Sequence, residues 1–306
     1  MTAIGFLGFG KVAAHLAAAL SRHGAKLASY DVLQGYSGGV DSLKQRVGEA
    51  AVEFVTLQEL VDRSNIVLSV VTTDAALDAV RACAAHLSDR HIYVDLNATS
   101  PAIKRSMAKV LKPSGGHFVE GAILNAIDVA GARARILVCG GKAKIVADTL
   151  TQFGLSVAFY GTEIGRASTF KLLRSVFSKG MEALLLETLL AARRAGIKDE
   201  VWNEILKTLD EQQFKDVGGN WMRTHGTAHA RRYHEMMQVR ELVSELGIEP
   251  LMSQATTAFF ERSTRLALSK AFPRDPLNQD EVLSALEKLL IDFTTDPRAK
   301  ENSRCD

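Results

Sequence analysis

Apolar and polar residues change their rhythm once along the chain, near residue 160. Before that point, short β-branched runs alternate with helical stretches rich in Ala and Leu, and turn residues separate them. This alternation is typical of a parallel sheet covered by helices. The expected strands are Ala3–Leu7, Lys26–Tyr30, Ile66–Val71, His91–Asp95, His117–Val119, Arg135–Cys139 and Ser156–Tyr160.

Helix starts in this half carry their own signals. Thr56 followed by Glu59 forms a capping-box pattern, and Ser100 precedes Pro101 at a first helical position. After Gly161 the pattern is helical to about residue 294 and indicates no strand.

We therefore expect an α/β fold: a Rossmann-type doubly wound sheet over residues 1–162, followed by an all-α C-terminal domain over residues 163–306. A helix from about Glu163 to Ala195 is expected to open the second domain. The polar end, TTDPRAKENSRCD, is expected to be a frayed tail.

Composition and charge narrow the classes of function. A net charge of +2, with Lys and Arg spread along the chain, predicts no nucleic-acid partner. Charges interrupt every apolar stretch before the roughly 20 residues of a membrane span, and no leader pattern precedes the first strand, so we expect a cytoplasmic protein. Cys83, Cys139 and Cys305 lack ligand spacing, so neither a disulfide framework nor a metal site is expected.

A glycine-rich turn follows the first expected strand. In AIGFLGFGKVAAHL the segment Gly8–Ala13 has the GxGxxA form of the dinucleotide-binding fingerprint, and an Ala-rich helix follows it. Gly8 permits the tight turn, Gly10 lets the backbone approach a pyrophosphate, and Ala13 lets the helix pack closely on the strand. The residues expected to contact the cofactor here are Gly8, Phe9, Gly10, Lys11 and Val12.

An acidic residue at the end of the second expected strand bears on the choice of cofactor. Asp31 is placed to accept hydrogen bonds from the adenine ribose and would repel a 2′-phosphate, which favours NAD over NADP. Lys26 and Arg46 leave NADP as the alternative. The simpler interpretation is that the glycines only make a turn and that Asp31 is a loop carboxylate.

A polar stripe follows the long helix of the second half. At 100° per residue, Arg174 and Ser175 fall within about 80° of Lys171, and most of the remaining surface is apolar. The stripe lines a cavity or is a narrow solvated face; periodicity alone leaves both open. A lysine suits hydride-transfer chemistry, because the alcohol oxygen needs a proton acceptor or donor.

Together these features resemble the β-hydroxyacid dehydrogenase family, which includes 3-hydroxyisobutyrate dehydrogenase and tartronate semialdehyde reductase. DLNATSP, from Asp95 to Pro101, resembles the substrate-loop motif Asp-x-Ser-Thr-x-x-Pro, and GTEIGRASTFK resembles the approach to the catalytic lysine, here Lys171. The resemblance implies an NAD(P)-dependent oxidoreductase that acts on the CH–OH group of a β-hydroxy acid, with Lys171 as general acid and base.

The resemblance also implies further site residues, several of them at positions that depart from the family pattern. Val70, Val71 and Thr72 stand where the family's cofactor loop reads Met-Leu-Pro, Ser175 replaces an amide, and the usual Ser-Gly-Gly turn is missing from VEGAILNAI. The implied cofactor contacts are Val71, Thr72, Asn97 and His234, the last in place of a lysine. The candidates for holding the substrate are Asn97, Asn125, Arg174 and Ser175.

KLLRSVFSKGMEALLLE and HARRYHEMM are most similar to a less-characterised branch of the family, 6-phosphogluconate-dehydrogenase-like with a distinct C-terminal domain. For His234 the alternative is a histidine that faces the helical core or solvent.

Two other functions remain open: an imine reductase, against which the retention of Lys171 counts, and a non-catalytic NAD(P)-binding protein. Family members commonly pair through the helical domain, so a homodimer is expected.

Overall fold

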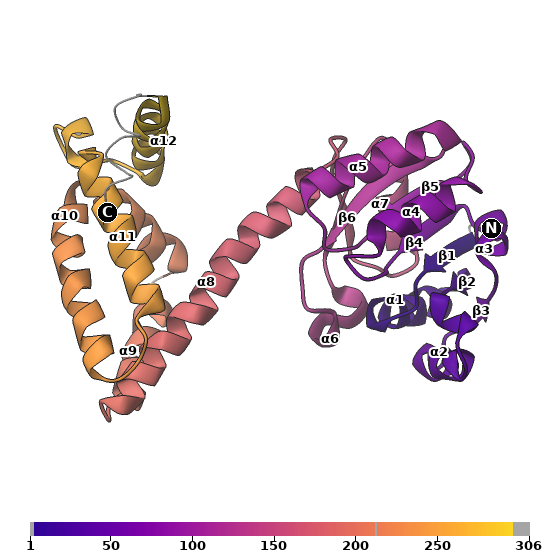
Figure 1. Ribbon diagram of the computed structural model, residues 1–306, viewed down its shortest axis with the longest axis horizontal. Helices are drawn as coiled ribbons and strands as arrows, with labels where there is room; N and C mark the ends of the chain where they lie inside the picture. The colour runs from indigo at the N-terminus through magenta and orange to yellow at the C-terminus, as the bar shows by residue number, and fades with distance from the viewer. Residues whose placement is uncertain (1–2, 212, 296–306) are drawn as a thin grey trace. The chain divides into compact units, whose positions relative to one another are not determined.

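Eight strands form one sheet among the described residues, 3–211 and 213–295, of the computed structural model (Figure 1). The strand order is β3-β2-β1-β4-β5-β6-β7-β8, and the first six strands run parallel in the order of a doubly wound dinucleotide-binding fold. The strands are β1 (Ala3–Leu7), β2 (Lys26–Tyr30), β3 (Val52–Phe54), β4 (Ile66–Ser69), β5 (Ile92–Asp95), β6 (His117–Ile123), β7 (Ile136–Cys139) and β8 (Val157–Gly161).

The sheet confirms the expected fold class and corrects some details. The three-residue strand β3 was not expected, because it is too short to show a period. The chain leaves the sheet after Ser69, so Val70 and Val71 belong to the loop that follows β4. β7 pairs with β6 in the antiparallel sense, because the connection between them contains only short helical turns and makes no crossover over the sheet.

Helices cover both faces of this sheet. One apolar layer includes Leu16 and Leu20 of α1 and Val146 of α7, and the opposite layer includes Leu60 of α3 and Met107 of α5. The capping patterns at Thr56 and Ser100 are confirmed. The helices are α1 (Lys11–Arg22), α2 (Gly39–Val47), α3 (Leu57–Arg63), α4 (Ala76–Ala84), α5 (Pro101–Leu111), α6 (Ile127–Ala130) and α7 (Ala143–Gln152).

The second half is helical, as expected. Its elements are the long helix α8 (Arg166–Arg194), then α9 (Lys198–Asp210), α10 (Phe214–Glu245), α11 (Leu251–Arg265) and α12 (Gln279–Thr295). α10 packs against α11 and α12. The buried Glu187 of α8 accepts hydrogen bonds from the backbone N–H groups of Met252 and Ser253, which satisfies the N-terminus of α11.

The chain divides into two compact units, Met1–Val176 and Phe177–Asp306, and the division falls inside α8. β8 ends at Gly161, and the domain boundary at residue 162 stays a prediction. Most of the polar C-terminal segment, residues 296–306, lies outside the described residues. Within the described part of the chain, none of the helices combines the length and apolar character of a membrane span.

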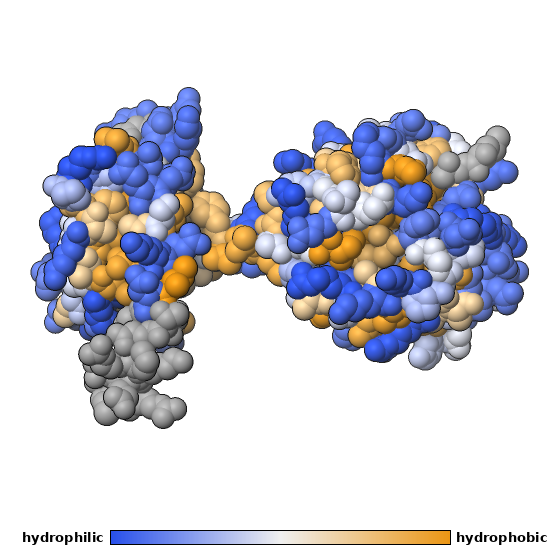
Figure 2. All heavy atoms as spheres, turned by 90° about the horizontal axis from the view of Figure 1, so that it is seen from above, coloured by the Kyte–Doolittle hydropathy of each residue, from blue (hydrophilic) through white to orange (hydrophobic). Residues whose placement is uncertain are grey.

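The helical unit has large apolar side chains at its surface. Figure 2 shows apolar side chains gathered among hydrophilic ones on one face of this unit. Trp202, Trp221 and Phe259 of this unit are at least one-third exposed. Apolar surface of this kind is typical of association sites, and the homodimer stays a prediction.

Candidate functional site

The glycine-rich turn after β1 is held against the loop after β4. Gly8 has a φ of +87°, and a Cβ atom there would lie 2.9 Å from Val71 Cγ1 and 3.0 Å from the Val70 carbonyl oxygen. Its N–H donates to the carbonyl oxygen of Tyr30 at the end of β2. A side chain at position 8 would therefore strain the backbone and push the two loops apart.

Gly10 begins the helix that the fingerprint predicts. It is the N-cap of α1, and no side chain caps the first turn. A Cβ atom on Gly10 would meet no protein atom within 4 Å, so the space above the helix N-terminus is open. Backbone N–H groups at such an end bind phosphate. Ala13, fully buried, packs into the core as the fingerprint requires.

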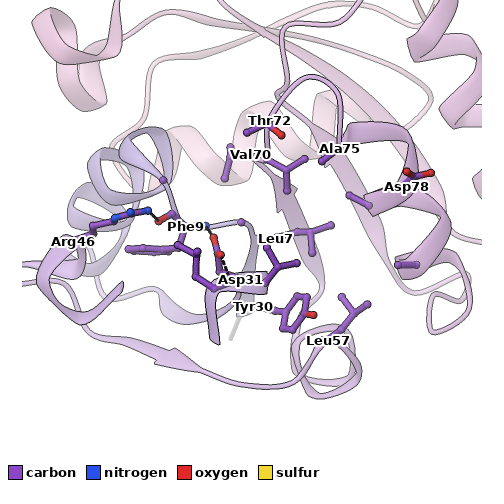
Figure 3. Close-up of a pocket in the computed structure, with 17 residues that line it drawn as sticks. Leu7, Phe9, Tyr30, Asp31, Arg46, Leu57, Val70, Thr72, Ala75 and Asp78 are labelled. Atoms are coloured by element: carbon purple, nitrogen blue, oxygen red, sulfur yellow. Dashed lines mark hydrogen bonds between the residues drawn. The ribbon is translucent and has the colours of Figure 1, made fainter. Parts of the chain in front are cut away.

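A cavity of about 620 Å³ opens at the carboxyl ends of β1, β2 and β4 (Figure 3). It lies where the strand order reverses between β1 and β4, the usual place for a dinucleotide in this fold. The glycine turn, Asp31 and the loop after β4 all line it. The volume, the open space at Gly10 and the uncapped helix fit a nicotinamide dinucleotide.

Asp31 has a structural role in addition to the expected one. Its carboxylate accepts hydrogen bonds from the backbone N–H groups of Phe9, at 2.7 Å, and Leu33, at 2.8 Å. It thereby ties the glycine turn to the end of β2. Arg46 also lines this cavity, with Nη1 3.5 Å from the carbonyl oxygen of Phe9, whereas Lys26 does not line it. Figure 3 shows both Asp31 and Arg46 beside Phe9.

A second cavity, of about 300 Å³, brings together Lys171, Asn97 and Asn125. It shares Val70, Val71 and Thr72 with the first cavity, so the loop after β4 separates the two. The rest of its lining is mainly apolar: Val12, Leu96, Ala98, Ile123 and Ile127, with Thr73. Three of the residues predicted from the sequence as catalytic or substrate-binding therefore meet at one place.

Hydrogen bonds leave each of the two asparagines one free function. The Asn97 amide nitrogen donates to the Asp95 carboxylate and to Ser69 Oγ, so its carboxamide oxygen is left to accept. The Asn125 oxygen accepts the backbone N–H of Arg135, so its NH₂ group is left to donate. The cavity thus offers the Lys171 amine, a hydrogen-bond acceptor from Asn97 and a hydrogen-bond donor from Asn125.

Lys171 is the one ionisable residue among those that line this cavity. Burial, with a smaller contribution from the Lys104 ammonium, holds the pKa of Lys171 below its ordinary value. The helix that carries it is anchored by the buried Glu120 of β6, which accepts from Ala167 N at 2.7 Å and from Ser168 Oγ at 3.1 Å. A lysine with a lowered pKa on a fixed helix suits general acid–base chemistry.

A buried ion pair under the substrate loop was not expected from the sequence. Lys104 of α5 binds the Asp95 carboxylate, and both side chains are almost fully buried. A signal was present in the sequence: Lys104 shares the buried face of α5 with Met107 and Leu111, at a spacing of three and seven residues.

Other predicted residues use their polar groups elsewhere. Arg174 donates to the carbonyl oxygen of Leu124 at 2.6 Å, Ser175 Oγ donates to the Lys171 carbonyl oxygen at 2.9 Å, and neither lines the Lys171 cavity. Lys11 is exposed and pairs with Asp128 at 3.3 Å. His234 lies on α10, in the helical unit, with an exposed side chain.

The two described cysteines are buried. Burial raises the pKa of the Cys83 thiol to about 12 and that of Cys139 to about 11, so neither is a thiolate at neutral pH. Cys305 lies outside the described residues.

Two family models match segments of the chain, one in each half. Residues 3–161 match the NAD binding domain of 6-phosphogluconate dehydrogenase. Residues 192–263 match a domain of unknown function, DUF1932.

Two curated relatives are similar in sequence. An uncharacterized 28.5 kDa protein of Methanothermus fervidus is 29% identical over 258 residues, which cover 84% of this chain and 97% of that protein. The mitochondrial 3-hydroxyisobutyrate dehydrogenase of Drosophila melanogaster is 22% identical over 210 residues, which cover 67% of this chain and 63% of that enzyme.

Solved structures are similar in fold. The conserved protein MTH1747, of unknown function and described as structurally similar to 3-hydroxyacid dehydrogenases, is 32% identical, with 87% of this chain and 98% of that one covered and a TM-score of 0.59. An imine reductase from Myxococcus stipitatus in complex with NADP+ is 18% identical, with 92% and 98% covered and a TM-score of 0.72. The second likeness shows the fold alone.

Proposed function

We propose that this protein oxidises the CH–OH group of a β-hydroxy acid or a similar small polar substrate. The chain belongs to a family of NAD(P)-binding dehydrogenases that share the NAD binding domain of 6-phosphogluconate dehydrogenase, and this family is related to the 3-hydroxyacid dehydrogenases. The reverse reduction uses the same site. The observation that carries the proposal is the meeting of Lys171 with Asn97 and Asn125 in a cavity next to the dinucleotide cavity.

The bound cofactor supplies the hydride acceptor in oxidation and the hydride donor in reduction. Lys171, as a free amine, accepts the hydroxyl proton while the substrate carbon gives up its hydride, so that the alcohol becomes a carbonyl. As an ammonium it returns that proton in the reverse reaction. The apolar residues around the cavity exclude water and strengthen these interactions.

The two amides orient the substrate. We assign the Asn97 oxygen to a hydroxyl of the substrate other than the reacting one, whose proton goes to Lys171, and the Asn125 NH₂ group to a carboxylate or carbonyl oxygen. Those are the functions that the other hydrogen bonds of the two amides leave free. Backbone groups of the loop after β4, at Val71 and Thr72, are proposed to contact the nicotinamide part of the cofactor.

A second candidate follows from the lining of the cavity. Besides Lys171, no cationic side chain lines it, so a carboxylate has few partners there and a less polar carbonyl or imine would fit the apolar walls. An imine reductase activity is therefore the alternative. A non-catalytic NAD(P)-binding protein would bind the cofactor and turn over no substrate.

Thermal shifts with NAD, NADH, NADP and NADPH, followed by absorbance of the reduced cofactor, separate these functions. We expect a nucleotide-dependent shift and then turnover with members of a panel of 3-hydroxy acids. Turnover with cyclic imines alone would support the second candidate, and a shift without any turnover would support the non-catalytic one. No shift with any nucleotide would contradict all three.

The pH dependence of turnover is expected to differ between the two directions. Oxidation needs the free amine of Lys171, so kcat/KM should rise with pH and level off above the pKa of that residue. Because burial and the Lys104 charge lower this pKa, the midpoint should fall below about 10.4, the ordinary value for lysine. Reduction needs the ammonium and should decline through the same midpoint. A midpoint at or above the ordinary value in pH–rate profiles would contradict this role.

For the cofactor we propose a preference for NAD, because Asp31 lines the dinucleotide cavity and opposes a 2′-phosphate. Asp31→Ser removes the charge and keeps a hydroxyl that can cap the following turn, so the ratio of Kd values should move toward NADP by roughly 10-fold. Arg46 is placed to pair with the phosphate in that variant. Isothermal titration with NADH and NADPH measures the ratio. Asp41→Ser, at an exposed position on α2, is the matched control, and an unchanged ratio in Asp31→Ser would show that Asp31 does not discriminate.

A further inference from the structure

The Lys104 ammonium lies in the interior of the sheet unit, under the loop that carries Asn97. Its side chain is 1% exposed. Besides the Asp95 carboxylate, Nζ contacts the carbonyl oxygens of Asp95 at 3.0 Å, Asn97 at 2.8 Å and Gly121 at 3.4 Å. An ammonium has three protons to donate, so these contacts use all of them.

A chain of hydrogen bonds links Lys104 to the side chain of Asn97. One oxygen of the Asp95 carboxylate accepts from Lys104, and the other accepts from the Asn97 amide nitrogen, which also donates to Ser69 Oγ. Lys104 therefore holds Asn97 twice, once through its backbone and once through its carboxamide. Both contacts fix the direction of the free Asn97 oxygen.

Internal stability is a weak explanation for this ion pair. Taking an ammonium and a carboxylate out of water costs free energy that their attraction only partly returns, and apolar pairs of similar volume are often as stable. The position of this pair beside a cavity favours a role in orienting the residues that line the cavity.

Other charged groups of the neighbouring elements are engaged in other contacts. Glu120 of β6 binds the first turn of α8, Asp128 of α6 pairs with Lys11 of α1, and Arg174, one turn after Lys171, binds the Leu124 carbonyl oxygen. Burial lowers the pKa of the Lys171 amine most, and the Lys104 ammonium lowers it further.

We propose that Lys104 is a positioning residue of the Lys171 site, which orients Asn97 through Asp95 and fixes an ammonium group under the loop that lines the cavity. The proposal deepens the proposed function, on which it rests. Lys104 does not itself line the cavity, so it acts on the cavity through Asp95 and Asn97.

Competitive acetylation with acetic anhydride over a range of pH, read for the Lys171 peptide by mass spectrometry, tests the proposal without any substrate. With Lys104→Met we expect the labelling midpoint of Lys171 to shift to higher pH, because a like charge has been removed. Lys109→Met, an exposed lysine on the same helix, should leave the midpoint where it is in the unaltered protein.

Lys104→Met leaves Asp95 buried without its partner, so the variant can be poorly folded. The double variant Lys104→Met/Asp95→Asn removes both charges and keeps an acceptor for Asn97, and we expect it to fold and to retain the raised midpoint. An unchanged midpoint in a folded variant of either kind would overturn the proposal. Failure of the proposed function is a separate result: it would appear as absent turnover in the unaltered protein, with the labelling midpoints still measurable.

Discussion

Replacement of Lys171 by alanine is expected to lower kcat by about 10²- to 10⁴-fold, the usual contribution of a positioned general acid or base. The affinity for the cofactor should change little, because the dinucleotide cavity is lined by other residues. Steady-state kinetics with a substrate from the panel, together with titration of the reduced cofactor, measures the two effects separately.

The control for this variant is Lys109→Ala, which removes an exposed lysine of the same unit. It should retain full activity. Near-normal kcat in Lys171→Ala would remove Lys171 from the reaction. An equal loss of cofactor affinity and of kcat would assign it to binding rather than to proton transfer.

Substitution of Gly10 by valine is expected to abolish most cofactor binding without harm to the fold. Gly10 has an ordinary negative φ, and a Cβ atom there meets no protein atom, so the free protein accommodates a side chain. In the complex that side chain would occupy the space proposed for the pyrophosphate. Overlap that costs about 3 kcal/mol would raise Kd roughly 100-fold.

Gly141→Val provides the matched control, since a Cβ at Gly141 also meets open space and lies outside both cavities. Both variants should unfold at a Tm close to that of the unaltered protein. Isothermal titration with NADH should then separate them. Equal affinity in Gly10→Val and Gly141→Val would place the pyrophosphate away from the α1 N-terminus.

Local sequence signals were sufficient to predict the glycine turn and Asp31, which line the first cavity. The glycine turn, the helix after it and Asp31 lie within about one βαβ unit, and the spacing of such a unit is set by short-range geometry. The unexpected part was the double use of Asp31, which also binds the Phe9 N–H. That hydrogen bond depends on how closely β1 and β2 pack, which no spacing rule gives.

The second cavity could be predicted only in part. Lys171 and Asn97 were expected through the family resemblance, and Asn125 was a candidate for holding the substrate. Asn97 follows β5, Asn125 follows β6, and Lys171 lies on α8. Lys104 was missed, because a lysine on an amphipathic helix is normally solvated, and the burial of Lys104 depends on its partner Asp95 at the end of β5. The role of His234, in the other unit, stays a prediction.

The most direct test of the central claim is a crystal structure of the protein with its oxidised cofactor bound. It should place the pyrophosphate on the first turn of α1, the adenine ribose at Asp31 and the nicotinamide ring in the cavity that contains Lys171 and Asn97. A nicotinamide ring outside that cavity, or a cofactor bound away from the Gly8 turn, would contradict the proposed function.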